Sequence, residues 1–390
     1  MSELVVRAYN VLFGDALLVS IPERDDDGTE ATRTLLIDVG NLLANDNDVF
    51  TDVVKDIAEQ TGGVVDLYVM THEHMDHVQG LLAAANAGVV LSARYAWLTG
   101  SAAPDYYEKH QDAKEKKNGL AQALTSLAVQ QQANPDPWLA MMIANNSLLL
   151  PDGALGLTTG DYVDHLRTLA PADKTTYVDR TTDLDGRHPF TEATLRILAP
   201  EEDTSTYYGR FQQPKLTAAG GDGSAAEAAR PAASGDAGPP VGIDAGAFYD
   251  LVNARDNVNA ASVLAIDAAA NNTSVVIEIT WRGWKLLFCG DAEKRSWQTM
   301  LANNQLEPVH FVKIAHHGSS TGTVADILDT VLPQEPPDDK SRQAIVSTRH
   351  HMDWPSVPDD DTLELYSGRC TLLDTSTVPP GQAVEATFSA

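Results

Sequence analysis

The run HEHMDH at residues 72–77 places three histidines and one aspartate close together in the chain. Neutral imidazole and carboxylate are ligands that zinc, manganese and iron accept in proteins. His72 and His74 are two residues apart and project to one side of an extended segment, whereas Asp76 and His77 begin the turn that follows. The run therefore predicts a site for one or two divalent metal ions, and solvated surface histidines are a poorer explanation of it.

A hydrolytic centre with two metals also needs a carboxylate that can bridge the ions. Asp291 follows an apolar strand and is our prediction for this role, although most Gly-Asp pairs are turns, as we expect for Gly14-Asp15. His316 and His317 end another apolar strand. They offer either a further metal ligand or a cation that stabilises negative charge on a substrate, and the simpler alternative is a polar turn.

A last histidine pair, His350 and His351, also follows an apolar strand, at residues 344–346. Here a role as metal ligand and a role as ordinary polar loop residues remain equally open.

The elements that carry these residues are predicted from period-two and helical patterns. An apolar strand at 64–70 leads into the 72–77 run, and a helix at 78–87 follows it. A hairpin of strands at 273–280 and 284–289 delivers Asp291, and a strand at 309–315 delivers His316. Further strands are expected at 4–22, interrupted around Gly14, and at 34–39, with helices at 49–60 and 293–303.

Two segments depart from this alternation of strand and helix. Residues 101–190 are rich in helix formers and predict a helical insertion that caps the site. Residues 216–246 are rich in Ala, Gly, Ser and Pro, which indicates a flexible surface loop. The whole chain of 390 residues is interpreted as one domain that contains both segments.

Composition excludes several classes of protein. No apolar stretch is long enough to span a bilayer and no secretory signal is evident, so a cytoplasmic location without membrane contact is expected. Two cysteines, Cys289 and Cys370, are too few for a disulfide framework and are expected to be buried and reduced. The net charge of −28 opposes long-range attraction of nucleic acid.

Taken together, the 72–77 run, the strand ending in Asp38-Val39-Gly40, the Gly290-Asp291 turn and the His316-His317-Gly318-Ser319 segment resemble the metallo-β-lactamase superfamily. The order of segments is most similar to its competence-type (ComEC-like) branch. The resemblance covers residues 4–100 and 190–390 and implies an α/β fold, a four-layer αβ/βα sandwich with a helical insertion.

The resemblance also implies roles for single residues. His72 and His74 would serve one metal, Asp76 and His77 the other, with Asp291 between them. Asp38 would orient the histidine loop from behind. In the mechanism that follows, Asp76 or Asp291 would hold the attacking hydroxide, and His316 or His317 would stabilise the developing charge or bind the second ion. We assign Asp76 and His316 to catalysis and His317 to metal binding. The branch's usual final His-Pro pair is replaced by Trp354-Pro355, so the last ligand is either missing or supplied by His350 or His351.

These features lead to three hypotheses. The first is a hydrolase with one or two Zn or Mn ions that cleaves a phosphodiester, with a small molecule, a nucleotide or nucleic acid as substrate. The second is an acyl hydrolase acting on a lactone, thioester or lactam. The third is a regulatory or binding module with weak catalysis. The sequence predicts no particular protein partner.

Overall fold

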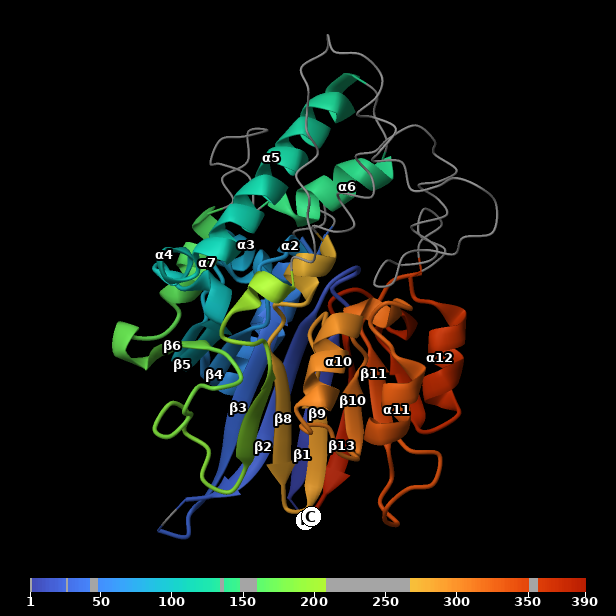
Figure 1. Ribbon diagram of the computed structural model, residues 1–390. Coiled ribbons are helices and arrows are strands. Elements are labelled where there is room, and N and C mark those ends of the chain that lie inside the picture. The colour runs from blue at the N-terminus through green and yellow to red at the C-terminus, as the bar shows by residue number, and fades with distance from the viewer. Residues whose placement is uncertain are drawn as a thin grey trace.

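The computed structural model describes residues 2–25, 27–42, 48–133, 137–147, 160–207, 267–350 and 357–390. Within these ranges the chain forms two β-sheets that face each other, with helices on their outer sides (Figure 1). The segment 216–246 and the residues His351, Trp354 and Pro355 lie outside the described ranges.

The first sheet has seven strands in the order β13-β1-β2-β3-β4-β5-β6. The pairs from β13 to β3 are antiparallel and those from β3 to β6 are parallel, so the sheet is mixed. Its strands are β1 (Glu3–Tyr9), β2 (Ala16–Arg24), β3 (Glu30–Val39), β4 (Val64–Met70), β5 (Ser92–Thr99), β6 (Thr175–Val178) and β13 (Ala383–Ser389).

The second sheet has six strands in the order β12-β11-β10-β9-β8-β7. Strands β9 to β12 run parallel, and β7 and β8 are antiparallel to their neighbours. The strands are β7 (Thr194–Ala199), β8 (Val276–Trp281), β9 (Trp284–Phe288), β10 (Phe311–Lys313), β11 (Gln343–Val346) and β12 (Thr371–Asp374).

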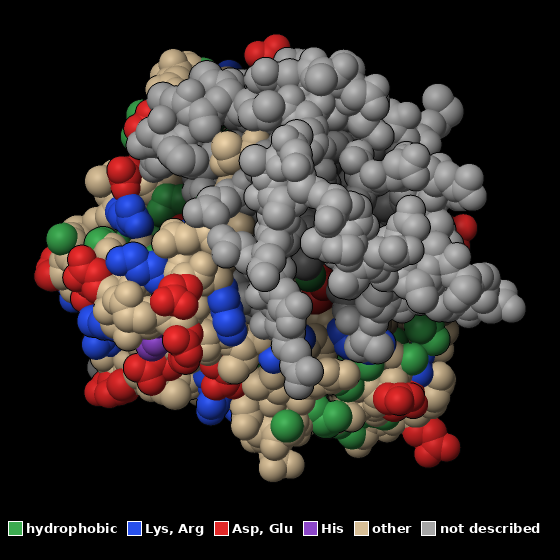
Figure 2. Space-filling model, turned by 45° about the horizontal axis from the view of Figure 1, so that its top comes forward, with side chains coloured by type: hydrophobic (Ala, Val, Ile, Leu, Met, Phe, Trp, Pro, Cys, Tyr) green, Lys and Arg blue, Asp and Glu red, His purple; other side chains and the backbone are tan. Residues whose placement is uncertain are grey.

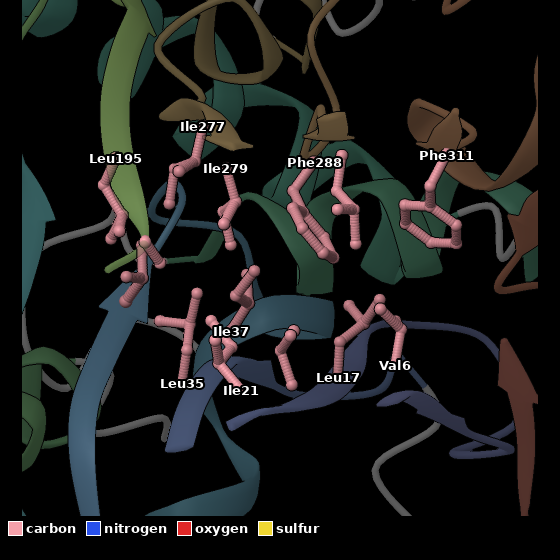
Figure 3. Close-up of a cluster of buried hydrophobic side chains, with 14 of the residues drawn as sticks. Val6, Leu17, Ile21, Leu35, Ile37, Leu195, Ile277, Ile279, Phe288 and Phe311 are labelled. Atoms are coloured by element: carbon pink, nitrogen blue, oxygen red, sulfur yellow. The ribbon is translucent and has the colours of Figure 1, made fainter. Parts of the chain in front are cut away.

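The two sheets pack face to face through alternate apolar residues. Leu17 and Ile37 of the first sheet and Ile277 and Phe288 of the second are buried in one common cluster (Figure 3). Because successive side chains of a strand point to opposite faces, the intervening residues, such as Leu36, face outward and need a second cover.

Helices supply that cover on both outer faces. On the first sheet, α1 (Asp48–Thr61), α3 (Gly80–Asn86) and α7 (Gly160–Arg167) bury one apolar cluster. On the second, α10 (Lys294–Ala302), α11 (Ala325–Val331) and α12 (Asp360–Ser367) bury another. The predicted α/β class is confirmed, and the two mixed sheets with helices outside are consistent with the expected sandwich.

The segment 101–190 contains two different parts. The helices α4 (Tyr106–Lys109), α5 (Gln111–Ala133) and α6 (Pro137–Asn145) lie outside the layers, with α5 and α6 beyond the upper ends of the strands (Figure 1). In contrast, α7 packs against the first sheet and β6 is its edge strand, so residues 160–178 belong to the layers. The predicted helical insertion therefore does not extend over residues 160–178.

Composition also led to expectations about membrane helices, the two cysteines and surface charge. In the described part of the chain no helix is both long and apolar enough to cross a membrane. Both cysteines are free, but only Cys289 is buried, whereas Cys370 is half-buried. Basic and acidic side chains lie side by side on the described part of the face in Figure 2.

Candidate metal centre

Three strand ends bring the predicted ligands together at one edge of the sandwich. His72 and His74 leave the end of β4, and Asp76 and His77 lie in the short helix α2 (Met75–Val78) that follows. Asp291 follows β9, and His317 follows β10. Since β9 and β10 are parallel, their carboxyl ends lie at the same edge, where β4 of the facing sheet also ends.

The tightest group, which we call the quartet, consists of Asp76, His77, Asp291 and His317. One ligand atom of each lies within 4.8 Å of the others. Asp291 Oδ2 is 3.2 Å from both His77 Nε2 and His317 Nε2, and His317 Nε2 is also 3.2 Å from Asp76 Oδ2. All four side chains are buried. The quartet thus joins two carboxylates and two imidazoles from three separate loops.

The donor set of the quartet fits a divalent cation. Asp76 Oδ1 and Asp291 Oδ1 are buried, and neither has a hydrogen-bond partner among the described residues. Burying such atoms without a partner costs free energy, and buried carboxylates are normally paired or bound to a metal. Mixed imidazole and carboxylate donors suit zinc or manganese.

Opposite charges set the pKa values within the quartet. Burial raises the pKa of Asp291, but His317 and His77 outweigh burial and hold that pKa well below its usual value. Burial lowers the pKa of His317, yet Asp291 and Asp76 raise it to about 10. A cation that binds here has to displace the proton from His317, because only a neutral imidazole can be a ligand.

Asp38 fixes the ring of His77 from the opposite side. Its Oδ2 accepts a hydrogen bond from His77 Nδ1 at 2.8 Å and one from the Thr71 hydroxyl at 2.6 Å. The bond to Nδ1 leaves Nε2 directed at the quartet, as in the carboxylate–histidine pairs behind many metal ligands. Asp38 has a left-handed φ of 52°, which a non-glycine residue adopts only where its surroundings enforce it.

His72 and His74 form a second pair of donors beside the quartet. His72 Nε2 and His74 Nδ1 are 3.0 Å apart, and the His72 ring centroid is 4.2 Å from that of His77. Burial, reinforced by the neighbouring His77, holds the pKa of His72 well below its usual value, which keeps that imidazole neutral.

The loop after α6 determines which nitrogen of His74 carries the proton. Asn146 Nδ2 donates to the Met142 carbonyl at 3.0 Å and to Asp267 Oδ1 at 2.9 Å, so both amide hydrogens are used. Its Oδ1, which can only accept, lies 3.0 Å from His74 Nε2. His74 Nε2 is therefore protonated, and the lone pair of Nδ1 faces His72.

The hydroxyl of Thr71 determines in the same way which nitrogen of His72 carries the proton. Thr71 donates its hydrogen to Asp38, so it accepts one from His72 Nδ1, 3.1 Å away, and the lone pair of His72 is on Nε2. Ser274 Oγ lies 3.3 Å from the same Nδ1. Two lone pairs that face each other across 3.0 Å repel unless a proton or a cation lies between them.

Replacing Asn146 should weaken metal binding. In Asn146→Leu the Nε2 of His74 loses its acceptor and either tautomer can form, so we expect zinc affinity to fall by roughly 10–100-fold. Competition against a chelating dye measures this affinity. Asn303→Leu changes an exposed asparagine at the end of α10 and is the matched control. If wild type and Asn146→Leu bind zinc with equal affinity, Asn146 does not contribute to metal binding.

Two buried residues at the centre were missed by sequence reasoning. Asp15, expected to be part of a simple turn, is buried beside His317, with 3.6 Å between Asp15 Oδ1 and His317 Nδ1. Lys313 of β10 forms an ion pair with Asp15 and lies 3.6 Å from Asp291 Oδ1. Burial lowers the pKa of Lys313, but Asp15 and Asp291 outweigh it and raise that pKa above its usual value. Lys313 is therefore a fixed positive charge behind Asp291.

His316 and His317 point to different groups although they are neighbours. Both have left-handed backbones, with φ of 49° and 51°. His316 lies outside the quartet, with Nδ1 3.3 Å from Glu293 Oε1 and 3.0 Å from the Thr321 hydroxyl. Glu293, Asp267 and His316 form a second group of metal-type donors within 4.8 Å of one another.

The final histidine pair does not join the centre in the described structure. His350 is exposed, and its Nε2 lies 3.3 Å from Asp374 Oδ2. It belongs to none of the donor groups found among the described residues. His351 is outside those residues. The fourth member of the quartet is His317, and the Ser347 carbonyl orients it by accepting a hydrogen bond from its Nδ1 at 2.9 Å.

Comparison with known proteins adds no further assignment. No protein-family model matches the chain, and no curated protein matches it either.

Proposed function

We propose that the protein is a metal-dependent hydrolase. More narrowly, we propose a phosphodiesterase of the metallo-β-lactamase superfamily, similar to its competence-type branch, with one or two Zn or Mn ions. The observation that carries this proposal is the convergence of buried metal-type donor atoms of Asp76, His77, Asp291 and His317 at one edge of two packed sheets. Two of the carboxylate oxygens, Asp76 Oδ1 and Asp291 Oδ1, have no hydrogen-bond partner among the described residues. The facing lone pairs of His72 and His74 beside them supply the donors for a second ion.

A divalent cation, when bound, would supply Lewis acidity, which lowers the pKa of water to near neutrality and polarises the bond to be broken. The chain's own residues provide the rest. Asp76, His77, Asp291 and His317 would hold one ion, and His72 and His74 the other. Asp38, Asn146 and Ser347 orient three of these imidazoles, so the donors are arranged before a substrate arrives.

Two residues outside the metal ligands complete the proposal. Lys313 forms an ion pair with Asp15 and lies 3.6 Å from Asp291 Oδ1, so its positive charge balances the negative charge buried there. His316, paired with Glu293, lies next to His317 and can carry the positive charge that stabilises negative charge on a substrate.

A two-substrate comparison tests the reaction class. Protein loaded with zinc or manganese should release nitrophenol from bis(p-nitrophenyl) phosphate, and a chelator should abolish the release. Turnover of a lactone in the same buffers is the contrasting assay. If only the lactone is hydrolysed, the protein is an acyl hydrolase; if neither is hydrolysed and less than one ion binds per chain, the binding module is the better reading.

A further inference from the structure

A groove beside the metal centre carries a positive charge that no described residue neutralises. The cavity has a volume of about 600 Å³, and its polar side includes Arg349, His350, Ser376 and Thr377. Leu12 and Pro379 contribute to its apolar side. The groove therefore combines a cationic wall, the Ser376 hydroxyl and an apolar surface. The Thr377 hydroxyl donates to the Asp374 carbonyl at 2.6 Å and can only accept from a ligand.

Arg349 is half-buried, and among the described residues no carboxylate lies within ion-pair distance and no hydrogen bond satisfies its guanidinium. The neighbouring His350 differs, because it faces Asp374. An arginine without a partner is unexpected in a chain with a net charge of −28. A planar guanidinium matches the oxygens of a phosphate, to which it can donate two parallel hydrogen bonds.

Two short stretches of chain connect the groove to the quartet. Ser347, whose carbonyl accepts from His317, precedes Arg349 by two residues, so their Cα atoms are at most about 7 Å apart. On the other wall Leu12 adjoins Phe13, whose ring centroid is 4.7 Å from that of His317. A substrate held at the quartet can therefore extend into the groove.

The walls of the groove are fixed by hydrogen bonds. Asn10 Nδ2 donates to the Val378 carbonyl at 2.6 Å, and Asn10 Oδ1 accepts from the Leu12 amide at 2.9 Å. Thr348, just before Arg349, is tied to Thr375 by its amide at 3.0 Å. The three chain segments around the groove are thus braced against one another, as a preformed binding site requires.

We infer that this groove binds a second phosphate of the substrate, next to the phosphodiester that lies at the metal centre, with Arg349 as the principal contact. The inference rests on the proposed function and names its substrate class as a phosphodiester that carries at least one further phosphate. Arg349 would act in binding rather than in the chemical step.

The test is an equilibrium titration that needs no turnover. Thymidine 3′,5′-bisphosphate has two phosphates and no diester, and thymidine 5′-monophosphate has only one phosphate. Both are titrated calorimetrically into metal-loaded wild type, Arg349→Ala, Arg349→Lys and Arg282→Ala. Arg282 lies in the β8–β9 turn and is the control for the loss of one positive charge.

We expect Arg349→Ala to bind the bisphosphate about tenfold more weakly, because a hydrogen-bonded ionic contact is lost. Arg349→Lys should fall between Arg349→Ala and wild type, and Arg282→Ala should equal wild type. Binding of the monophosphate should be the same in all four proteins. This pattern can appear even if diester turnover fails, so the two proposals are separable.

Three results would overturn the inference. The first is equal bisphosphate affinity of wild type and Arg349→Ala. The second is an equal loss of monophosphate affinity in Arg349→Ala, which would place Arg349 at the scissile phosphate itself. The third is that succinate, a dicarboxylate, binds in an Arg349-dependent manner while the bisphosphate does not, which would assign the groove to carboxylates.

Discussion

Asp291→Ala should lower kcat/KM for phosphodiester hydrolysis by roughly a thousandfold or more. Asp291 is the carboxylate that contacts both imidazoles of the quartet, and Asp76 is its counterpart across His317. Its removal leaves His77 and His317 without their shared anion and takes a ligand from the cation. A Lewis acid contributes several kcal/mol to transition-state stabilisation, and each 1.4 kcal/mol is about tenfold in rate. The Asp76→Ala variant should show a loss of the same order.

The measurement pairs steady-state kinetics with metal content per chain. Glu278→Gln is the matched control, because Glu278 is also a buried carboxylate but lies in β8, paired with Arg196 at 2.9 Å. It should retain the turnover and the metal content of wild type. If the Asp291→Ala protein keeps its kcat/KM and its metal content within tenfold of wild type, the assignment of Asp291 to the centre is wrong.

The sequence predicted the parts of the site that are local in the chain. The 72–77 run carries its ligand types in six consecutive residues after an apolar strand, and β4 ends at Met70 as expected. The hairpin of β8 and β9 was equally predictable, because runs of β-branched and apolar residues on both sides of Arg282-Gly283 indicate paired strands.

Contacts made only after folding were not predictable. Asp15 looks like one more Gly-Asp turn until β10 brings Lys313 against it. Asn146 follows a helix that stands outside the layers, and an asparagine carries no metal signal of its own. Only the position of α6 beside α2 shows that this residue fixes the tautomer of His74.

The pair His316-His317 shows a different limit. The sequence identified both residues, but which of them joins the quartet depends on backbone angles. Two successive left-handed residues turn one imidazole toward Asp291 and the other toward Glu293. Our assignment of His317 to the metal did not rest on the residue types alone, because they do not distinguish the two neighbours and left-handed φ is uncommon outside glycine.

Gly40 gives the second large effect. A glycine after a strand often permits a tight turn, but the φ of Gly40 is not in the left-handed region. Its role is instead close approach. A Cβ at this position would lie 2.3 Å from the His77 amide nitrogen and 2.4 Å from the Asp76 carbonyl carbon. Both are backbone atoms, which cannot move aside as a flexible side chain would.

Gly40→Ala should therefore push the loop after β3 away from α2 and separate Asp38 from His77, whose hydrogen bond orients the ring toward the quartet. We expect a loss of about 3 kcal/mol in the free energy of unfolding, the upper range for overpacking, because the contact is with backbone. Urea unfolding with and without zinc measures this loss of stability, and zinc affinity should fall in parallel.

Gly368→Ala is the control: its φ of −70° suits any residue, and its nearest contact is the Glu364 carbonyl at 3.3 Å. A Gly40→Ala protein as stable as Gly368→Ala would show that the two loops are not in backbone contact and that Asp38 does not depend on Gly40 to reach His77.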